Sequence, residues 1–453
     1  MSRPGSLALV LHTHMPYVES YGTWPFGEEW LWEAIATSYL PLLDVLDAAP
    51  GRVTLSVTPV LADQLEAPGA LARCEAFLRE IRPESHRRDI ASATDPRIAA
   101  ALEASAAQYA AAAANVAGVF DRLMTHATWT SAATHPILPL LATSSGVRLQ
   151  LASGIAAHRT RRPRDDWSGG LWLPECAHVP WLDPLLEEAG VRLTCVELTD
   201  VFGEGAPEQL IPLRSGAGPL LVPIDREIID LVWGLDGYPS SGAYRDSYHM
   251  TEHRHRPWAV DGTPYDGRRA SRRARTDAAD FVTRVKHRVM GGGLCVCALD
   301  TELLGHWWHE GVIWLEAVLE RADAAGLPIV VLETAVDGLE ARPAPPLPVS
   351  TWGTPRDLST WSGRGARGLA WRQRRAELEL SREARPSVRA LRELLAAQAS
   401  DWAFLLTREL AGEYPVERVD GHLAGLAAAL AGPREPGVEH LAPHLVAAAF
   451  TGA

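Results

Sequence analysis

Short apolar runs alternate with longer helical stretches over the first two thirds of the chain. The runs are rich in Val, Leu and Ile and end in polar residues, as buried parallel strands do where they enter functional loops. They lie at residues 6–12, 52–58, 169–173, 193–196, 220–223, 294–299 and 328–332. Strands that alternate with helices over about 340 residues predict a parallel α/β domain with a barrel-like sheet.

Several segments depart from this alternation. Residues 66–127 are alanine-rich at helical spacing and predict a helical insertion within a barrel of residues 1–340. Residues 237–280 are polar and arginine-rich, which favours a solvated surface loop, with a mobile loop over an active site as the alternative. A proline-rich connector is predicted at 341–364, where it contributes to the site. Apolar stripes at three-to-four spacing then predict a C-terminal α-helical domain over 365–453.

The chain is acidic overall, with a net charge of −13 at neutral pH. Proteins that bind nucleic acid regardless of sequence need a cationic surface, so that class is disfavoured. No apolar run approaches the roughly 20 residues that cross a bilayer, and residues 7–11 are too short for the core of a signal peptide. The five cysteines are an odd number, which suggests reduced thiols in a cytoplasmic protein.

Tryptophan is unusually abundant, because its 16 copies equal tyrosine and phenylalanine taken together. Most tryptophans fill cores, but the flat indole also stacks on the apolar faces of sugar rings. A group of tryptophans beside carboxylates and histidines would therefore favour a carbohydrate-binding site.

Reactive side chains gather at the ends of three predicted strands. His12 and His14 project from the same face of the first strand, where they would bind a metal or hydrogen-bond a substrate. Glu175 directly follows a strand that is stopped by Pro174. Asp300 ends a strongly apolar strand and precedes a dense group of acids, histidines and tryptophans. Two strand-end carboxyl groups fit glycosidic cleavage, in which one attacks or stabilises the oxocarbenium-like centre and the other protonates the leaving oxygen.

Ordered segments of the chain resemble the motifs of glycoside hydrolase family 57, and more narrowly those of its 1,4-α-glucan branching enzymes. The most informative segments are HTHMPY from His12, GLWLPEC from Gly170, ALDTELLGHWWHEG from Ala298, STWG from Ser350 and QASDW from Gln398. Shorter matches are TPVLADQL from Thr58, ATH from Ala133, LPLL from Leu138, VW from Val232 and GYP from Gly237. Together the matches span nearly the whole chain.

The resemblance implies a (β/α)7 barrel with a helical insertion and a C-terminal α-helical domain. It implies a retaining double displacement with Glu175 as nucleophile and Asp300 as general acid/base. The side chains that would contact substrate, some as subsite walls, are His12, His14, Trp32, His135, Trp172, Tyr238, His306, Trp307, Trp352, Asp401 and Trp402. Tyr238 would lie on a loop over the site. No metal and no cofactor is implied.

The implied substrate is an α-1,4-glucan, whose cleaved chain would be transferred to a 6-hydroxyl to form an α-1,6 branch. Transfer prevails over hydrolysis when the acceptor is held in place and water is excluded. The segment after Tyr238 is shorter than is usual in the subgroup, which would favour hydrolysis. No nucleic-acid or membrane partner is expected, and the assembly is expected to be a monomer or a small homo-oligomer.

Other functions remain open at this point. An α-amylase or a 4-α-glucanotransferase on the same scaffold would use the same carboxyl pair and differ in its products. A metal-dependent hydrolase or deacetylase would use His12 and His14, with Asp300 as a third ligand. A glucan-binding protein without catalysis is disfavoured because both carboxyl groups are present. Glu302 is the alternative acid if Asp300 does not serve.

Overall fold

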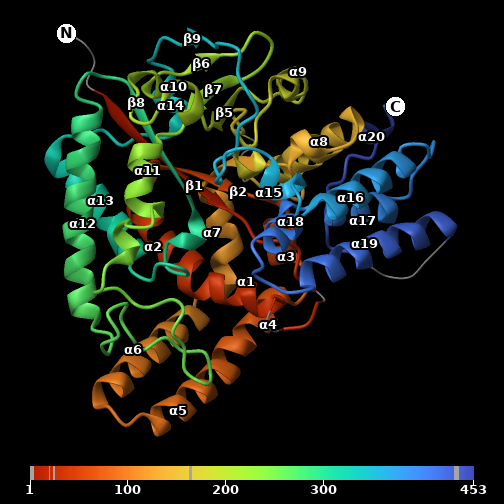
Figure 1. Cartoon of the computed structure of the whole chain (residues 1–453). Helices are drawn as coiled ribbons and strands as arrows, with labels where there is room; N and C mark the ends of the chain where they lie inside the picture. Colours follow the sequence, from red (N-terminus) through yellow and green to blue (C-terminus); the bar gives the residue numbers. More distant parts are fainter. Residues whose placement is uncertain (1–4, 20, 24–25, 163–165, 433–437, 453) are drawn as a thin grey trace.

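The computed structural model describes residues 5–19, 21–23, 26–162, 166–432 and 438–452. Its centre is a curled sheet of parallel strands with helices packed around the outside (Figure 1). The parallel strands are β1 (Ser6–Thr13), β2 (Val53–Val57), β3 (Ala127–Ser131), β4 (Leu171–Trp172), β5 (Leu193–Val196), β7 (Leu220–Pro223) and β8 (Leu294–Asp300). Two short strands, β6 (Leu213–Arg214) and β9 (Arg342–Pro343), extend the sheet beside β7.

The parallel strands close on themselves. They follow the order β8-β1-β2-β3-β4, while β5 pairs with β7. Gly170, just before β4, bridges Leu193 of β5. The amide of Asp225, just after β7, donates to the carbonyl of Val296 in β8 at 2.9 Å. The seven parallel strands of the described chain therefore form a barrel, and the predicted (β/α)7 fold is confirmed.

The central strands β1 and β8 are buried on both faces. Both are almost continuously apolar, and their side chains are buried from Leu7 to Leu11 and from Leu294 to Leu299. This pattern is typical of a parallel strand that is covered on both sides. At the carboxyl ends of these two strands the residues become polar, with His12 and Thr13 ending β1 and Asp300 ending β8. The carboxyl ends are therefore where reactive side chains lie.

Helices connect the strands and cover the barrel. They are α1 (Glu28–Ala34), α2 (Leu40–Ala48), α3 (Pro59–Glu66), α8 (Ser144–Arg161), α9 (Asp183–Glu188), α10 (Thr199–Phe202), α11 (Arg226–Trp233), α12 (Gly267–Arg288), α13 (Gly311–Ala325) and α14 (Leu332–Val336). A π-helical turn, Ile35–Tyr39, makes α1 and α2 continuous. Helices α12 and α13 pack together on one side of the barrel (Figure 1). Within the described residues, no helix combines the length and hydrophobicity that crossing a bilayer requires.

Two helical layers are added to the barrel. The insertion consists of α4 (Ala70–Ala76), α5 (Arg82–Ser92), α6 (Pro96–Ala113) and α7 (Val119–His126), with α5 and α6 projecting as a pair (Figure 1). The C-terminal layer consists of α15 (Ser359–Ser362), α16 (Arg367–Leu380), α17 (Val388–Ala397), α18 (Ser400–Thr407), α19 (Tyr414–Ala431) and α20 (Ala448–Thr451). It lies on the side of the barrel opposite to α12 and α13 (Figure 1). The predicted helical insertion and C-terminal helical domain are therefore present.

Three details of the sequence-based assignment are wrong. Residues 328–332 form no strand, because only Ile329 bridges to β1, and β2 already pairs with β1 from Leu9 onward. The short strand β3 was not predicted, since its five residues alternate too weakly to show a pattern. Residues 267–280 belong to α12 rather than to a loop, because the Asp266 carboxylate caps the helix and an alanine stripe faces the core.

Candidate active site

The carboxyl ends of the parallel strands bring the reactive side chains together. In the strand register, His12 of β1 lies opposite Ser56 of β2 on one side and Asp300 of β8 on the other. Glu175 lies in the turn that follows β4. Because the strands are parallel, their carboxyl ends open on the same end of the barrel, where the active sites of such barrels form.

Glu175 is held by the turn and by Trp352. Its backbone is left-handed, with φ 57° and ψ 22°, which is uncommon for a residue with a side chain and turns the chain sharply. The indole N–H of Trp352 donates to Oε2 of Glu175 at 3.1 Å, and the backbone N–H of Trp352 donates to the Glu175 carbonyl at 3.1 Å. Arg226 fixes Trp352 in turn by donating to its carbonyl at 2.6 Å while pairing with Glu197.

The surroundings raise the pKa of both carboxyl groups, for partly different reasons. Burial raises the pKa of Glu175 to about 7, although the hydrogen bond from Trp352 acts in the opposite direction. Burial, and then the negative charges of Glu302 and Glu175, raise the pKa of Asp300 well above its usual range. Asp300 therefore holds its proton more strongly than an ordinary aspartic acid, whereas Glu175 ionises close to neutrality. A carboxyl group that holds its proton beside one that ionises can act as an acid and a nucleophile.

Glu302, the alternative acid, already serves as a hydrogen-bond acceptor. Its Oε1 accepts from the hydroxyl of Tyr39 at 2.6 Å and from the backbone N–H of His14 at 3.1 Å. Burial raises the pKa of Glu302 to about 7. These contacts tie the end of β1 to the segment after β8, which favours a structural role for Glu302 and leaves Asp300 as the better acid.

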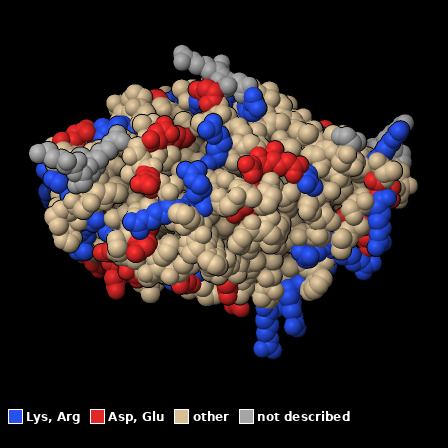
Figure 2. Space-filling model, turned by 90° about the horizontal axis from the view of Figure 1, so that it is seen from above, with Lys and Arg blue, Asp and Glu red and all other residues tan. Residues whose placement is uncertain are grey.

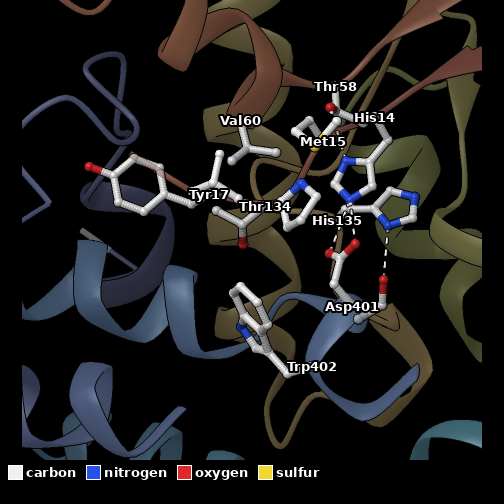
Figure 3. Close-up of polar contacts among 12 residues, drawn as sticks. His14, Met15, Tyr17, Thr58, Val60, Thr134, His135, Asp401 and Trp402 are labelled. Carbon is white, nitrogen blue, oxygen red and sulfur yellow. Dashed lines mark hydrogen bonds and ion pairs between the residues drawn. The ribbon is translucent and has the colours of Figure 1, made fainter. Parts of the chain in front are cut away.

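Three histidines stack beside the carboxyl pair, and Figure 3 shows two of them, His14 and His135. Their ring centroids are 4.0 Å apart and their planes meet at 23°. The ring of His12 lies 4.9 Å from that of His135 and 5.1 Å from that of Trp172. The Nε2 atoms of His12 and His135 are 3.0 Å apart and share a hydrogen bond.

Asp401 gives one histidine a different charge from the other two. The Nδ1 atom of His14 bonds to the hydroxyl of Thr58 at 3.1 Å, and its Nε2 atom bonds to the Asp401 carboxylate at 3.0 Å (Figure 3). Burial lowers the pKa of His14, but the negative charges of Asp401, Glu302 and Glu175 together outweigh it and the net pKa is raised. Burial lowers the pKa of His12 and His135 well below the usual range. The site thus offers two neutral imidazoles beside one that favours its cation.

The same residues are the candidate metal ligands in the described part of the chain. His14, His135 and Asp401 offer ligand atoms within 4.8 Å of one another, whereas His12, His14 and Asp300 do not form such a group. Two imidazoles bind one ion through lone pairs that converge in the ring planes, but these rings lie face to face. The ring nitrogens of His135 are also engaged, Nδ1 by the hydroxyl of Ser400 at 2.9 Å. The arrangement therefore does not fit metal binding.

Four of the predicted aromatic and histidine residues line this region. Trp172 is fully buried and meets Trp352 edge to face, with centroids 4.8 Å apart. Trp307 is 44% exposed, and its backbone N–H donates to the carbonyl of Glu302 at 3.2 Å. His306 lies edge to face against Trp307 at 5.0 Å, and burial lowers its pKa to about 4. An exposed indole next to a neutral imidazole suits contact with a sugar.

Three other predicted residues are not placed as walls of the site. Trp32 packs against Phe77 of the insertion, with ring centroids 5.1 Å apart, inside the main core. Trp402 is fully buried, and its indole N–H donates to a backbone carbonyl of α17 at 2.8 Å. The ring of Tyr238 lies in the main core, and its hydroxyl donates to Asp280 of α12 at 2.8 Å. Their indole and phenol rings fill cores in this structure.

Sequence analysis did not identify four polar residues that hold the site together. Thr58 and Ser400 lie inside motifs that were recognised, so motif membership is the signal that would have found them. Tyr39 and Arg226 carry no local signal, because their partners Glu302 and Trp352 lie 263 and 126 residues away along the chain. Only the folded chain brings such pairs together.

Comparison with known proteins places the chain in a family. The model of glycosyl hydrolase family 57 matches residues 8–348, which include both strand-end carboxyl groups. The chain belongs to glycoside hydrolase family 57. A second model, described as the C-terminal part of 1,4-alpha-glucan branching enzyme, matches residues 369–432, the layer that supplies Asp401.

Similar proteins within family 57 cover nearly the whole chain. A probable 1,4-alpha-glucan branching enzyme of Mycobacterium tuberculosis is 32% identical over 97% of this chain and 95% of its own length. The crystal structure of the family 57 branching enzyme from Pyrococcus horikoshii superposes with a TM-score of 0.85 at 30% identity, covering 92% of this chain and 88% of that one. The enzyme from Thermococcus kodakaraensis, solved with glucose and additives, also gives 0.85, at 28% identity, covering 97% of this chain and 94% of that one.

Proposed function

We propose that this chain is a 1,4-α-glucan branching enzyme that cleaves an α-1,4 link and transfers the released chain to a 6-hydroxyl. Both family models support the proposal, and the one for branching enzymes spans the layer that carries Asp401. The observation that carries the chemistry is that Glu175 follows β4 and Asp300 ends β8 at the same end of the barrel, where burial raises the pKa of both.

Asp300 acts as the general acid in the first step. Burial and the neighbouring negative charges raise its pKa and so favour the protonated form, which passes its proton to the glycosidic oxygen as the bond breaks. Proton loss then leaves Asp300 as the base that activates the acceptor hydroxyl in the second step. The proton that Asp300 takes from the acceptor hydroxyl in this step restores its acid form for the next cycle.

Glu175 acts as the nucleophile and forms the glycosyl-enzyme. The indole N–H of Trp352 orients its carboxylate and favours the ionised form that attacks. The left-handed backbone at Glu175 turns the chain sharply after β4 and holds the side chain against the indole of Trp352. We propose a retaining outcome because each of the two displacements inverts the anomeric carbon.

The histidine stack and the tryptophans hold the sugar at the cleaved bond. Every ring nitrogen of His12, His14 and His135 already has a protein partner, so a sugar hydroxyl would bind the stack by replacing one of these hydrogen bonds. Trp352 gives a partly exposed apolar wall beside Glu175, backed by the buried Trp172, and Trp307 gives an exposed surface. Such walls favour a bound glucan over water at the glycosyl-enzyme, which is the condition for transfer.

The surface fits a neutral polymer. Acidic and basic side chains are interspersed over the face seen in Figure 2, without one extended patch of a single sign on that face. An α-glucan carries no charge and needs no such patch. The proposal also includes a cytoplasmic location, supported by five unpaired and buried cysteines, and a monomeric or small homo-oligomeric state.

Proton NMR of amylose before and after incubation, with a parallel reducing-end assay, tests the function. Growth of the α-1,6 anomeric signal with few new reducing ends is the expected result. New reducing ends without that signal would identify an α-amylase instead, and redistributed linear chains would identify a 4-α-glucanotransferase. Redistribution of linear chains changes neither measurement, so chromatography of chain lengths accompanies them, and no change in all three would reject the three activities and favour a binding protein.

A further inference from the structure

A chain of buried polar side chains joins the C-terminal layer to the barrel next to the histidine stack. Its members are Thr134 after β3, Gln150 of α8, Gln398 at the end of α17 and Glu377 of α16. All four side chains are buried, Gln150 and Glu377 fully so. Burying amide and carboxyl groups is costly unless each finds a partner, so such a chain must be fully satisfied to be tolerated.

Hydrogen bonds run through this network without a break. Oε2 of Glu377 accepts from Nε2 of Gln398 at 2.9 Å. Oε1 of Gln398 accepts from Nε2 of Gln150 at 3.1 Å, and Oε1 of Gln150 accepts from the backbone N–H of Thr134 at 3.1 Å. The hydroxyl of Thr134 donates to the carbonyl of Leu395 at 2.6 Å, which returns the network to α17.

The two ends of the network fix the orientation of both amides. The carboxylate of Glu377 only accepts, and it also receives the backbone N–H and hydroxyl of Thr143 at 2.8 and 2.6 Å. The backbone N–H of Thr134 only donates. Gln398 must therefore turn its NH₂ group toward Glu377, and Gln150 must turn its oxygen toward Thr134. Because the donors and acceptors can be assigned in only one way, the network holds its side chains in a single arrangement.

Each end of the network adjoins a residue of the active site. Thr134 directly precedes His135, whose backbone is left-handed at φ 58°. Gln398 stands three residues before Asp401, at the break between α17 and α18. Between them, the backbone N–H of Ser400 donates to the carbonyl of His135 at 3.0 Å. Any shift of the end of α17 against α8 would therefore move Asp401 relative to the histidine stack.

We propose that Gln150 and Gln398 are positioning residues that hold Asp401 and His135 in register across the junction between the barrel and the C-terminal layer. The inference rests on the proposed function, because it assigns these residues a part in that reaction. They act through Asp401, whose carboxylate sets the charge of His14 beside Glu175.

A double-mutant cycle tests the proposal. Gln398→Glu keeps the shape of the side chain but sets a second carboxylate against Glu377. We expect it to lower kcat for a chromogenic α-maltoside about tenfold or more, with little change in KM. In an Asp401→Asn background the same change is expected to cost less than about twofold, because the residue through which Gln398 acts is already disabled. If the losses of kcat in the two single variants multiply in full in the double variant, the proposal would be overturned. An unchanged kcat in Gln398→Glu alone would overturn it as well.

Gln209→Glu is the matched control. Gln209 is also fully buried, and its amide donates to the carbonyl of Gly203 at 2.8 Å in the connection between α10 and β6. We expect this variant to lose thermal stability to a similar extent while keeping kcat near the wild-type value. An equal loss of kcat in both variants would assign the effect to stability and overturn the positioning role.

A second pair of variants and a readout independent of turnover complete the test. If Gln398→Glu does not fold, Gln398→Met and Gln150→Met replace it. Each is combined with Asp401→Asn in the same double-mutant cycle, adds no charge, and is judged by the same changes in kcat. NMR of histidine-labelled protein measures the pKa of His14, which is expected to fall in the Gln398 variants and to stay unchanged in Gln209→Glu. An unchanged His14 pKa in the Gln398 variants would refute positioning. Wild-type protein inactive on every α-glucan would instead refute the proposed function.

Discussion

Replacing Trp352 by phenylalanine removes one hydrogen bond from the Glu175 carboxylate while keeping an aromatic ring beside Trp172. The lost donor is the indole N–H at 3.1 Å from Oε2, and the backbone contacts of residue 352 with Glu175 and Arg226 stay in place. The bond stabilises the ionised form of Glu175. Its removal therefore raises the pKa of the nucleophile above its starting value of about 7.

The size of the effect follows from the energy of that bond. A hydrogen bond to a charged group contributes about 1.5 kcal/mol or more, and one pKa unit corresponds to about 1.4 kcal/mol. The pKa of Glu175 should thus rise by about one unit, and the ionised fraction at pH 7 should fall from about a half to about a tenth. We expect kcat/KM at pH 7 to fall about fivefold and to recover as the pH is raised, within the range that Asp300 tolerates.

The assay is the pH dependence of kcat/KM for a chromogenic α-maltoside, whose acid limb reports the ionisation of Glu175 in the free enzyme. Trp167→Phe is the control, because Trp167 loses an equivalent indole N–H that donates to the Gly170 carbonyl at 2.9 Å rather than to a carboxylate. Its acid limb should not move. An acid limb of Trp352→Phe that stays in place, or that moves to lower pH, would refute the account of how Glu175 is tuned.

Further expectations concern the remaining groups. Glu175→Gln should abolish transfer and hydrolysis together, and appreciable activity in the purified variant would reject Glu175 as nucleophile. Asp300→Asn should cripple turnover of amylose yet recover partly on donors with good leaving groups; wild-type behaviour would point to Glu302 as the acid. Arg161→Met should lower the free energy of unfolding in urea by about 3 kcal/mol, because it leaves the Asp63 carboxylate buried without its cation. A chelator should leave activity unchanged, and loss that Zn²⁺ restores would support the metal-dependent alternative.

The sequence was sufficient for the barrel and for the carboxyl pair. Strands such as β1 and β8 are continuously apolar, so their positions follow from hydrophobicity alone, and the residues that end them, including Asp300, are fixed by chain order. Short strands with mixed composition, such as β3, leave no such pattern, because pairing with neighbours rather than local preference makes them strands. The arginine-rich stretch looked like a loop because its exposed face carries the charge, while its buried stripe is mostly alanine.

The tertiary structure decided which groups meet and in which charge state. Sequence order places His14, His135 and Asp401 over a hundred residues apart, yet they form one hydrogen-bonded group in which Asp401 raises the pKa of His14. The sequence treated Trp352 and Trp402 alike as candidate walls, but packing leaves one on Glu175 and buries the other. Residue types and their order are local properties of the chain. The distance between two side chains, their burial and their protonation depend on which distant segments folding brings together, so only the tertiary structure determines them.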